Sequence, residues 1–332
     1  MDKKDYLIIY HREDNDGVFS AAILVDYLER MFNKSINDIE LMGANYNDLS
    51  KLTIEDFETW PEKYNHIAIL DVSFDEYNKM HKLYELYKDR MFWCDHHAPV
   101  IKRMFKLSQM HGIRDINNST IINVWRYLYD FMDEKWTNRE APELYRILSA
   151  YDSWSYEREG YDFDYVRACN IAITNEYDLD FSKVLGLVKT TQDDFENGKL
   201  NMVEEFAEMI LEKGKAIIKL RDKDNENLLK EYGDFNWTVD DKKACVLFWQ
   251  GGTNSTFFKW VKNNYPDVKR GVVFKRNNDS SWTISMYNIH DDDTFHCGEY
   301  LKNHYNGGGH KGAAGCNINE NKFIELLHSH KL

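Results

Sequence analysis

The sequence predicts an α/β protein with two domains, in which a mostly parallel, doubly wound sheet comes first and a smaller α/β domain follows a long connecting helix. Three observations favour this fold class. Short β-prone runs alternate with helical patterns over about the first ninety residues. Residues 201–232 carry apolar side chains at helical spacing, and after Gly233 the pattern changes to shorter β-rich segments. At 332 residues the chain also exceeds the usual size of a single domain. We expect a first domain over 1–190, a helical linker over 191–235 and a second domain over 236–332.

The N-terminal part reads as strands separated by helices, which is the order that forms a parallel sheet. The expected strands are 6–10, 40–44, 66–70 and 91–94, and the expected helices include 19–32 and 75–87. The carboxyl ends of parallel strands meet at one edge of a sheet, where ligands of open α/β sheets bind. Polar residues that directly follow these strands are therefore candidates for a site.

Farther along the chain, apolar spacing predicts further helices, and β-prone runs predict the strands of the second domain. The expected helices are 118–131, 143–150, 201–232, 254–264, 294–305 and 320–330, and the expected strands are 244–249, 268–275 and 282–287. Asn118, Ser119 and Thr120 provide the chemistry of a helix N-cap for the first of these helices.

Acidic and imidazole side chains follow three of the first four strands and one helix. In chain order they are His11, Asp14, Asp16, Asp71, Asp95, His96, His97 and Asp152. A helix cap or a solvated turn explains any one of them taken singly, and Asp152 is the weakest candidate by sequence alone. The series as a whole favours a metal site, because such groups at one sheet edge can share cations.

If six of these groups, namely His11, Asp14, Asp16, Asp71, His96 and Asp152, converge, they can hold two divalent cations. One carboxylate must then bridge the two ions, and Asp71 is our choice for it. The mixture of oxygen and imidazole ligands suits Mn²⁺ better than Mg²⁺, while Zn²⁺, Co²⁺ and Fe²⁺ stay open. Such a pair activates a shared water and clamps both oxygens of an in-line phosphoryl displacement, which indicates hydrolysis of a phosphate ester.

The glycine-rich segment GGGHKGAAG, from Gly307 to Gly315, is a second candidate site, and Gly307, Gly308, Gly309, His310 and Lys311 are its candidate ligand-binding residues. Glycines let the backbone approach a ligand and turn N–H groups toward anionic oxygens. His310 adds a donor and Lys311 a positive charge. The segment lacks the ending of a Walker P-loop and follows a helix, so that motif is excluded. A flexible turn is the alternative interpretation.

Composition limits the partners and the compartment. The net charge of −14 argues against a protein that tracks long nucleic acid through a basic groove. Short substrates held by cations are still compatible with it. Five scattered cysteines in no CxxC pair suit reduced thiols in the cytoplasm. We find no apolar run long enough for a membrane span, and a homodimer stays open as the oligomeric state.

Five motifs fall in the order found in one known family. They are HREDNDG at 11–17, LDVS around Asp71, the Asp95-His96-His97 triplet, YDSW around Asp152 and GGGHKGAAG at 307–315. On these motifs the chain resembles the DHH/DHHA1 phosphoesterases over nearly its whole length. The resemblance implies that the six residues above bind two manganese ions, that His97 protonates the leaving oxygen or neutralises charge, and that Asp95 orients the histidines.

The resemblance also implies a substrate class. It assigns His310 and the neighbouring glycines to the phosphate and sugar of the substrate. Many members carry an arginine where this sequence has Tyr287, and tyrosine cannot grip a phosphate bidentately but can stack on a base. Lys275, Arg276 or Lys311 could take the place of that arginine.

We therefore expect a metal-dependent phosphodiesterase of the nano-RNase, or oligoribonuclease, type. It would hydrolyse short oligonucleotides to mononucleotides. Members of this type often also dephosphorylate 3′-phosphoadenosine 5′-phosphate, which makes that compound a further candidate substrate. A cyclic-dinucleotide phosphodiesterase is the main alternative within the enzyme class, and a nucleotide sensor without catalysis is the alternative outside it.

Overall fold

A computed structural model of the chain describes residues 3–131, 140–199, 204–254, 256–290, 294–309 and 311–332. The chain divides into two compact units, Met1–Ile217 and Ile218–Leu332, and the boundary lies within the long helix α11 (Glu204–Tyr232). We describe each unit by itself.

The first unit is built around a sheet of four parallel strands in the order β2-β1-β3-β4. The strands are β1 (Lys4–His11), β2 (Ile39–Ala44), β3 (Tyr64–Leu70) and β4 (Met91–Cys94). Leu7, Ile8 and Ile9 of β1 are fully buried, because helices cover both faces of the sheet. The predicted parallel sheet is confirmed.

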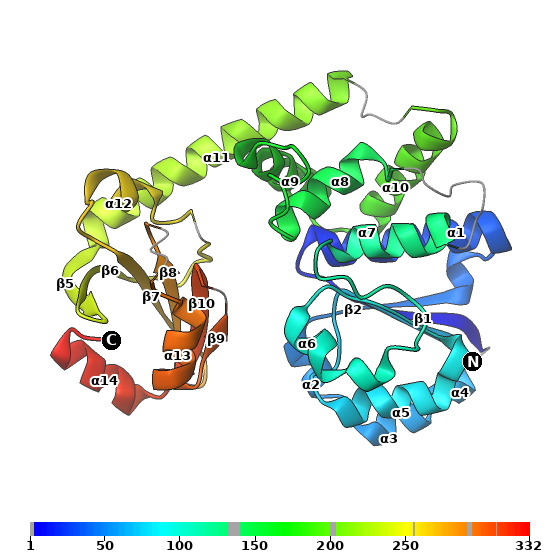
Figure 1. The fold of residues 1–332 in the computed structure, drawn as a ribbon, viewed down its shortest axis with the longest axis horizontal. Helices are drawn as coiled ribbons and strands as arrows, with labels where there is room; N and C mark the ends of the chain where they lie inside the picture. The colour runs from blue at the N-terminus through cyan, green and yellow to red at the C-terminus, as the bar shows by residue number, and fades with distance from the viewer. Residues whose placement is uncertain (1–2, 132–139, 200–203, 255, 291–293, 310) are drawn as a thin grey trace. The chain divides into compact units, whose positions relative to one another are not determined.

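Two hydrophobic cores flank this sheet, and successive residues of β1 point into different ones, Ile8 into the first and Leu7 and Ile9 into the second. The first core packs α1 (Asn15–Phe32), α7 (Thr120–Trp125), α8 (Glu143–Asp152), α9 (Phe163–Tyr177) and α10 (Phe181–Glu196). The second contains residues of α2 (Tyr46–Ser50), α3 (Ile54–Glu58), α4 (Trp60–Lys63), α5 (Tyr77–Tyr87) and α6 (Ala98–Arg103). Figure 1 shows α1 and α7 on one side of the strands and α3, α4 and α5 on the other, which is the doubly wound arrangement.

Short helices of other types complete the first unit. They are the 3₁₀ helices η1 (Ile36–Asp38), η2 (Lys88–Arg90) and η3 (Phe105–Leu107) and the π-helix η4 (Arg126–Phe131). The predicted helix over 118–131 is therefore two segments, since α7 ends at Trp125 and continues as η4.

The second unit has a mixed sheet of six strands in the order β5-β6-β7-β8-β10-β9. The strands are β5 (Asp234–Val239), β6 (Lys242–Phe248), β7 (Arg270–Arg276), β8 (Trp282–Asn288), β9 (Gly308–Gly309) and β10 (Ala313–Ile318), and the helices are α12 (Lys259–Asn264), α13 (Cys297–Tyr305) and α14 (Glu320–Ser329). Strands β6 and β7 pair in parallel and the other pairs are antiparallel. This confirms the predicted second α/β fold.

The structure corrects several sequence-based boundaries. Helices α9 and α10 and strand β5 were not expected, and α12 is shorter than the predicted helix over 254–264. Part of the glycine-rich segment is also a strand, because β10 pairs with β8 along its whole length. Its residues AAGCNI have low intrinsic β propensity, so tertiary pairing and not the local pattern determines that strand.

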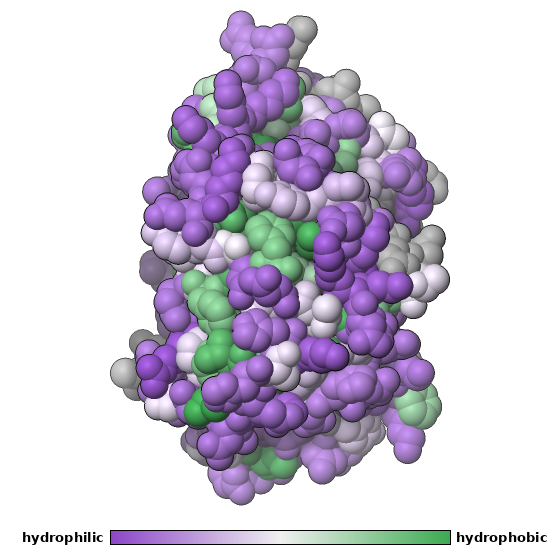
Figure 2. Space-filling model, turned by 90° about the vertical axis from the view of Figure 1, so that its left-hand side faces the viewer, coloured by the Kyte–Doolittle hydropathy of each residue, from purple (hydrophilic) through white to green (hydrophobic). Residues whose placement is uncertain are grey.

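Among the described residues, no helix combines the length and the apolar character that a bilayer span requires. Figure 2 shows one face of the molecule, on which hydrophilic residues cover most of the surface and hydrophobic residues form a narrow band. This agrees with the high charged fraction of the sequence, 30%.

Two helical glycines of the first unit allow a matched test of the packing. A Cβ atom on Gly214 in α11 would lie 2.0 Å from the Ala168 carbonyl oxygen, whereas a Cβ on Gly186 in α10 would meet no atom within 4 Å. We predict that Gly214→Ala lowers the free energy of unfolding by about 1–3 kcal/mol through overpacking. Gly186→Ala should raise it by up to about 1 kcal/mol, because alanine is the better helix former. Urea denaturation measures both, and equal effects of the two substitutions would contradict the packing of α11 against α9.

Candidate metal centre

The first part of the centre lies where β1 passes into α1. His11 is the last residue of β1, and Asp14 is the N-cap of α1, where its Oδ1 accepts the Gly17 N–H at 3.0 Å. The other Asp14 oxygen lies 2.9 Å from His11 Nδ1. Gly17 permits this tight turn, since a Cβ there would lie 2.0 Å from the His11 carbonyl oxygen. The N-cap interpretation thus holds for Asp14 and leaves His11 and Asp16 to be explained.

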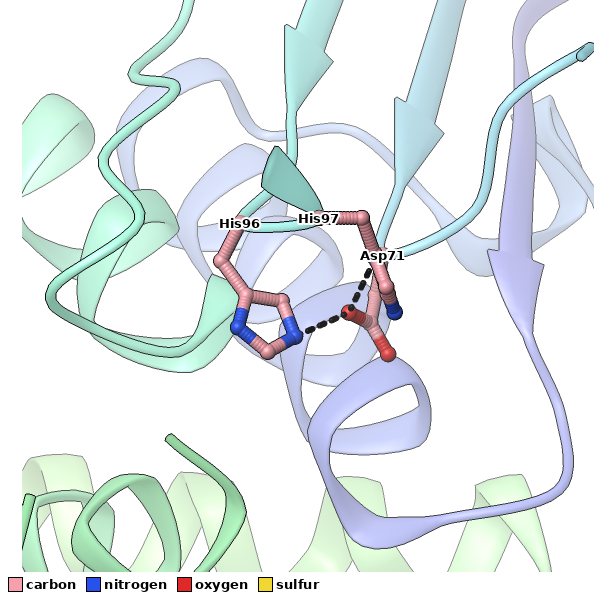
Figure 3. A group of neighbouring side chains, drawn as sticks. All are labelled: Asp71, His96 and His97. Carbon is pink, nitrogen blue, oxygen red and sulfur yellow. Dashed lines mark ion pairs between the residues drawn. The ribbon is translucent and has the colours of Figure 1, made fainter. Parts of the chain in front are cut away.

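Asp71 lies in the middle of the centre, directly after β3. It is 1% exposed, and its φ of +58° is in the left-handed region that aspartate tolerates better than most residues. Its Oδ2 lies 3.8 Å from His11 Nδ1, and its Oδ1 lies 3.4 Å from His96 Nε2. Figure 3 shows the His96 ring directed toward this carboxylate from the segment that follows β4. The two oxygens therefore face different imidazoles, as a bridging carboxylate requires.

His96 connects three carboxylates. Its Nε2 lies 3.2 Å from Asp152 Oδ2, 3.4 Å from Asp71 Oδ1 and 3.7 Å from Asp16 Oδ2. Asp152 is the last residue of α8, and its buried Oδ2 accepts no hydrogen bond from the described residues, because the contact with His96 Nε2 lacks hydrogen-bond geometry. A buried carboxylate oxygen without a donor is costly, and a bound cation would satisfy it.

The six predicted ligands fall into two triplets that share no residue. They are His11, Asp14 and Asp71, and Asp16, His96 and Asp152, and within each triplet one donor atom per residue lies within 4.8 Å of the others. Asp71 and His96 join the triplets through their contact of 3.4 Å. Each triplet supplies oxygen and imidazole donors, so the residues present fit two divalent cations of the Mn²⁺ type. All six come to one place in the structure.

His97 belongs to a third triplet with Asp71 and His96, yet its ring is held by a different group. Its Nδ1 lies 2.8 Å from Asp95 Oδ1, and that same oxygen accepts the backbone N–H groups of His96 and His97. Asp95 is fully buried, and its other oxygen accepts the Trp93 indole N–H at 3.3 Å. Asp95 thereby orients His97 through the ring and His96 through the backbone.

The protonation of this pair follows from its contacts. Burial is the largest single influence and opposes the charge of both groups, but the hydrogen bond between them and the attraction of neighbouring charges together outweigh it. The pKa of Asp95 is therefore lowered and the pKa of His97 is raised from their usual values. With Nδ1 held by Asp95, Nε2 is the nitrogen through which His97 can exchange a proton with a ligand.

Carboxylates crowd the rest of the centre. Burial raises the pKa of Asp71, and repulsion by Asp16, Asp14 and Asp152 raises it further. The pKa of Asp152 is raised by burial and then by Asp16 and Asp14. Divalent cations would remove this repulsion and favour the ionised forms.

Two supporting residues were not found from the sequence. The backbone N–H groups of Thr120 and Ile121 each donate to one Asp16 oxygen at 2.8 Å, and the Thr120 hydroxyl donates to Asp71 Oδ1 at 2.9 Å. Ser119 occupies the N-cap of α7 but makes no capping bond with its side chain, so Asp16 caps this helix from a distant part of the chain. The cap residues were recognised, but their long-range partner has no local signal.

Tyr46 is another residue that sequence reasoning missed. Its ring centroid lies 6.0 Å from that of His11 and 6.0 Å from that of His97. It opens α2 just after β2, so its position beyond the carboxyl end of a parallel strand was the signal that could have found it.

The glycine-rich segment of the second unit has a partly structural explanation. A Cβ on Gly307 would lie 2.5 Å from Cys316 Cβ, and Gly309 has a φ of +141° that other residues rarely adopt. At Gly308 and Gly312, by contrast, a Cβ would meet no described atom within 4 Å. Packing thus accounts for Gly307 and Gly309, while Gly308 and Gly312 leave room for a ligand to approach the backbone.

The other candidates near this segment have varied surroundings. Lys311 is exposed, and its carbonyl oxygen accepts the Cys297 N–H at 3.0 Å. His310 lies outside the described residues. Tyr287 is 7% exposed, with its ring against Phe258 and its hydroxyl 2.8 Å from Thr253 Oγ1. The Tyr287 ring therefore presents no open face on which a base could stack.

The crowding predicts how stability depends on pH and metal. The pKa of Asp71 is higher in the folded state than in the unfolded state, where it is about 3.9. As the pH rises above that unfolded value and through the folded-state pKa, the metal-free fold therefore loses stability. We predict that Asp71→Asn stabilises the metal-free protein at pH 7.5 by on the order of 1 kcal/mol and weakens its pH dependence. Mn²⁺ should raise the Tm of the wild type and have little effect on that variant.

The exposed Asp89 in η2 provides the control, because Asp89→Asn removes the same charge away from the centre. Thermal unfolding with and without Mn²⁺ measures all three proteins. The assignment of Asp71 as a metal ligand would be contradicted if Mn²⁺ does not change the Tm of the wild type. It would also be contradicted if the Tm of Asp89→Asn responds as little to Mn²⁺ as that of Asp71→Asn.

No protein-family model and no curated protein sequence matches the chain. Solved structures do match it. The DHH domain of a protein described as a member of a family of ribosomal proteins has a TM-score of 0.57 and 13% identity, over 98% of this chain and 85% of that chain. A pGpG-specific phosphodiesterase from Vibrio cholerae has a TM-score of 0.48 and 13% identity, over 98% of this chain and 97% of that one.

RecJ from Thermus thermophilus, in complex with Mn²⁺, has a TM-score of 0.48 and 15% identity over 98% of this chain, which spans 51% of RecJ. Of these three structures, only the first has a TM-score above 0.5, and at 13% identity the similarity supports a shared fold alone. The chain thus has the DHH-domain fold that its sequence motifs predict.

Proposed function

We propose that the protein is a metal-dependent phosphodiesterase that hydrolyses short oligonucleotides to mononucleotides, with two Mn²⁺ ions as cofactors. The observation that carries the proposal is the pair of ligand triplets, joined by the contact between Asp71 and His96, at the carboxyl edge of a sheet with the DHH fold. Two divalent ions held there would activate water and neutralise the charge of a bound phosphate. The five buried free cysteines suit the reducing cytoplasm, where we place the protein.

The residues around the centre have separate tasks in this proposal. His97 donates a proton from Nε2 to the leaving oxygen, because Asp95 holds its other nitrogen and raises its pKa. Thr120 and Ile121 fix the Asp16 carboxylate through their N–H groups, and the Thr120 hydroxyl fixes Asp71. These bonds restrain both carboxylates before any ligand arrives, which reduces the cost of ordering them on binding.

In this proposal the second domain, residues 236–332, supplies contacts to the phosphate and sugar of the substrate. The open backbone at Gly308 and Gly312 supports an approach of phosphate and sugar to the glycine-rich segment, where His310 and Lys311 supply donors. The net charge of −14 supports a short substrate, since a long strand would meet a repulsive surface. In this proposal Tyr287 does not stack on a base, and its hydroxyl lies beside Thr253.

A substrate series tests the proposed reaction. Purified protein with Mn²⁺ should cleave linear di- to pentanucleotides to mononucleotides, and the rate should fall with increasing length, because the acidic surface repels long strands. Linear pApA and the cyclic dinucleotide should be compared side by side by liquid chromatography. Faster cleavage of the cyclic compound would move the function to a cyclic-dinucleotide phosphodiesterase. Binding without cleavage of any compound would favour a nucleotide sensor.

The role of His97 can be separated from metal binding by the choice of leaving group. We predict that His97→Gln lowers kcat on a dinucleotide by about 10²–10⁴-fold, the usual contribution of a general acid. The loss should be much smaller on a p-nitrophenyl phosphodiester, whose leaving oxygen needs no proton. His96→Gln, which removes a ligand, should lower kcat on both substrates.

The control for these variants is His81→Gln in α5, a partly exposed histidine whose side chain is 42% accessible. It should leave kcat on both substrates unchanged. Equal losses of His97→Gln on the two leaving groups would exclude a proton-donor role and make His97 a third ligand beside Asp71 and His96 instead.

A further inference from the structure

Trp154 is a large exposed aromatic residue next to the metal centre. It lies two positions after Asp152, so the two Cα atoms are at most about 7 Å apart. Its exposed fraction is 60%, among the highest of the large hydrophobic residues in the described chain. The indole ring is thus exposed to solvent, on a residue two positions from the group that we assign to cation binding.

The backbone of Trp154 is in a conformation that usually selects glycine. Helix α8 ends with Ser153 as C-cap, and the Ser155 N–H donates to the Ala150 carbonyl at 3.1 Å, which is the outer bond of a Schellman motif. Trp154 occupies the left-handed position of that motif with a φ of +55°. Glycine fits there without strain, whereas a side chain with a Cβ is disfavoured.

The ring is also held in a fixed orientation by other aromatic residues. Phe163 stacks on it with a centroid distance of 5.4 Å and an interplanar angle of 16°, and Tyr156 lies 6.3 Å away. Tyr151 in turn stacks on Phe163 at 6.4 Å. The aromatic group preorganises the indole, yet most of the Trp154 surface stays open, so core packing does not explain the residue.

A strained backbone and an exposed, preorganised ring beside a candidate catalytic centre together indicate a ligand contact. We propose that Trp154 is a stacking platform for a nucleobase of the substrate that binds at the metal centre. The inference rests on the proposed function in that the ligand is a nucleotide. It goes further in assigning base recognition to the first unit, at a residue that is neither a metal ligand nor part of the glycine-rich segment.

Stacking determines what kind of specificity the platform gives. Every base has a π-face, so an indole accepts all four bases and discriminates by stacking strength rather than by hydrogen bonding. We expect purines to bind better than pyrimidines, with no selection within either class. Recognition of this kind suits an enzyme that degrades short fragments of any sequence.

Kinetics on matched substrates test the platform. Trp154→Gly removes the ring and keeps the left-handed cap, and Trp154→Phe keeps a smaller ring. On pApA with Mn²⁺, the glycine variant should raise KM about tenfold with little change in kcat, and phenylalanine should restore most of the loss. Two analogues of pApA, each without one of the two bases, identify the base that stacks. On the analogue without that base, the wild type and the glycine variant should have the same KM.

The control is Phe32→Ala, which removes an exposed ring, 55% accessible, at the far end of α1 and should leave KM unchanged. Melting temperatures show that each variant is folded. An unchanged KM of Trp154→Gly on pApA, or an equal rise on pApA and on both analogues, would overturn the platform.

Equilibrium binding separates this inference from the proposed reaction. Calorimetry with Mn²⁺ should show that Trp154→Gly binds AMP about tenfold more weakly than the wild type does, while ribose 5-phosphate binds equally to both. If the wild type cleaves no oligonucleotide but this difference holds, the proposed function fails and the platform stands. If cleavage occurs and AMP affinity does not depend on Trp154, the platform fails alone. Absence of AMP binding to the wild type would overturn the platform as well.

Discussion

Repulsion among carboxylates is the constraint on which the centre of the first unit depends. Asp16 and Asp71 are nearly inaccessible to water, at 2% and 1% exposure, and Asp14 and Asp152 lie close enough to raise the pKa of Asp71. A fold keeps such a cluster only if other groups compensate for its charge. His11, which lies beside Asp14 and Asp71, supplies part of that compensation, and divalent cations would supply the rest. The same repulsion that destabilises the metal-free protein therefore provides the affinity for metal.

The sheet and the start of α7 make this cluster possible. Strands β1, β3 and β4 are neighbours and run parallel, so the residues that follow them meet at one edge, at the point between β1 and β3 where the strand order reverses. The N–H groups of Thr120 and Ile121 hold Asp16 from the other side. Asp95 does the same for the loop after β4, through three hydrogen bonds to its Oδ1. Backbone and buried side chains thus fix the donors, which is the preorganisation that a metal or phosphate site needs.

Sequence reasoning reached the residues whose position follows from a strand end, and it was weaker elsewhere. Asp71 and His96 follow strands with clear apolar patterns, so their convergence could be expected from a parallel sheet. Asp152 ends a helix, and no local sequence pattern predicts where the end of that helix lies relative to the sheet. Strand β10 exists because β8 and β9 pair with it, and the burial of Tyr287 depends on its packing against Phe258, neither of which a local pattern encodes. The five motifs nonetheless predicted the DHH fold, since they occur together in the order found in that family.

The central claim is that Asp71 lies between two cation sites, and anomalous X-ray scattering from crystals grown with Mn²⁺ tests it most directly. We predict two peaks at the manganese absorption edge. One should lie among His11, Asp14 and Asp71, and the other among Asp16, His96 and Asp152, with Asp71 touching both. A single peak that leaves one of these triplets without a cation, or peaks at other residues, would contradict the claim.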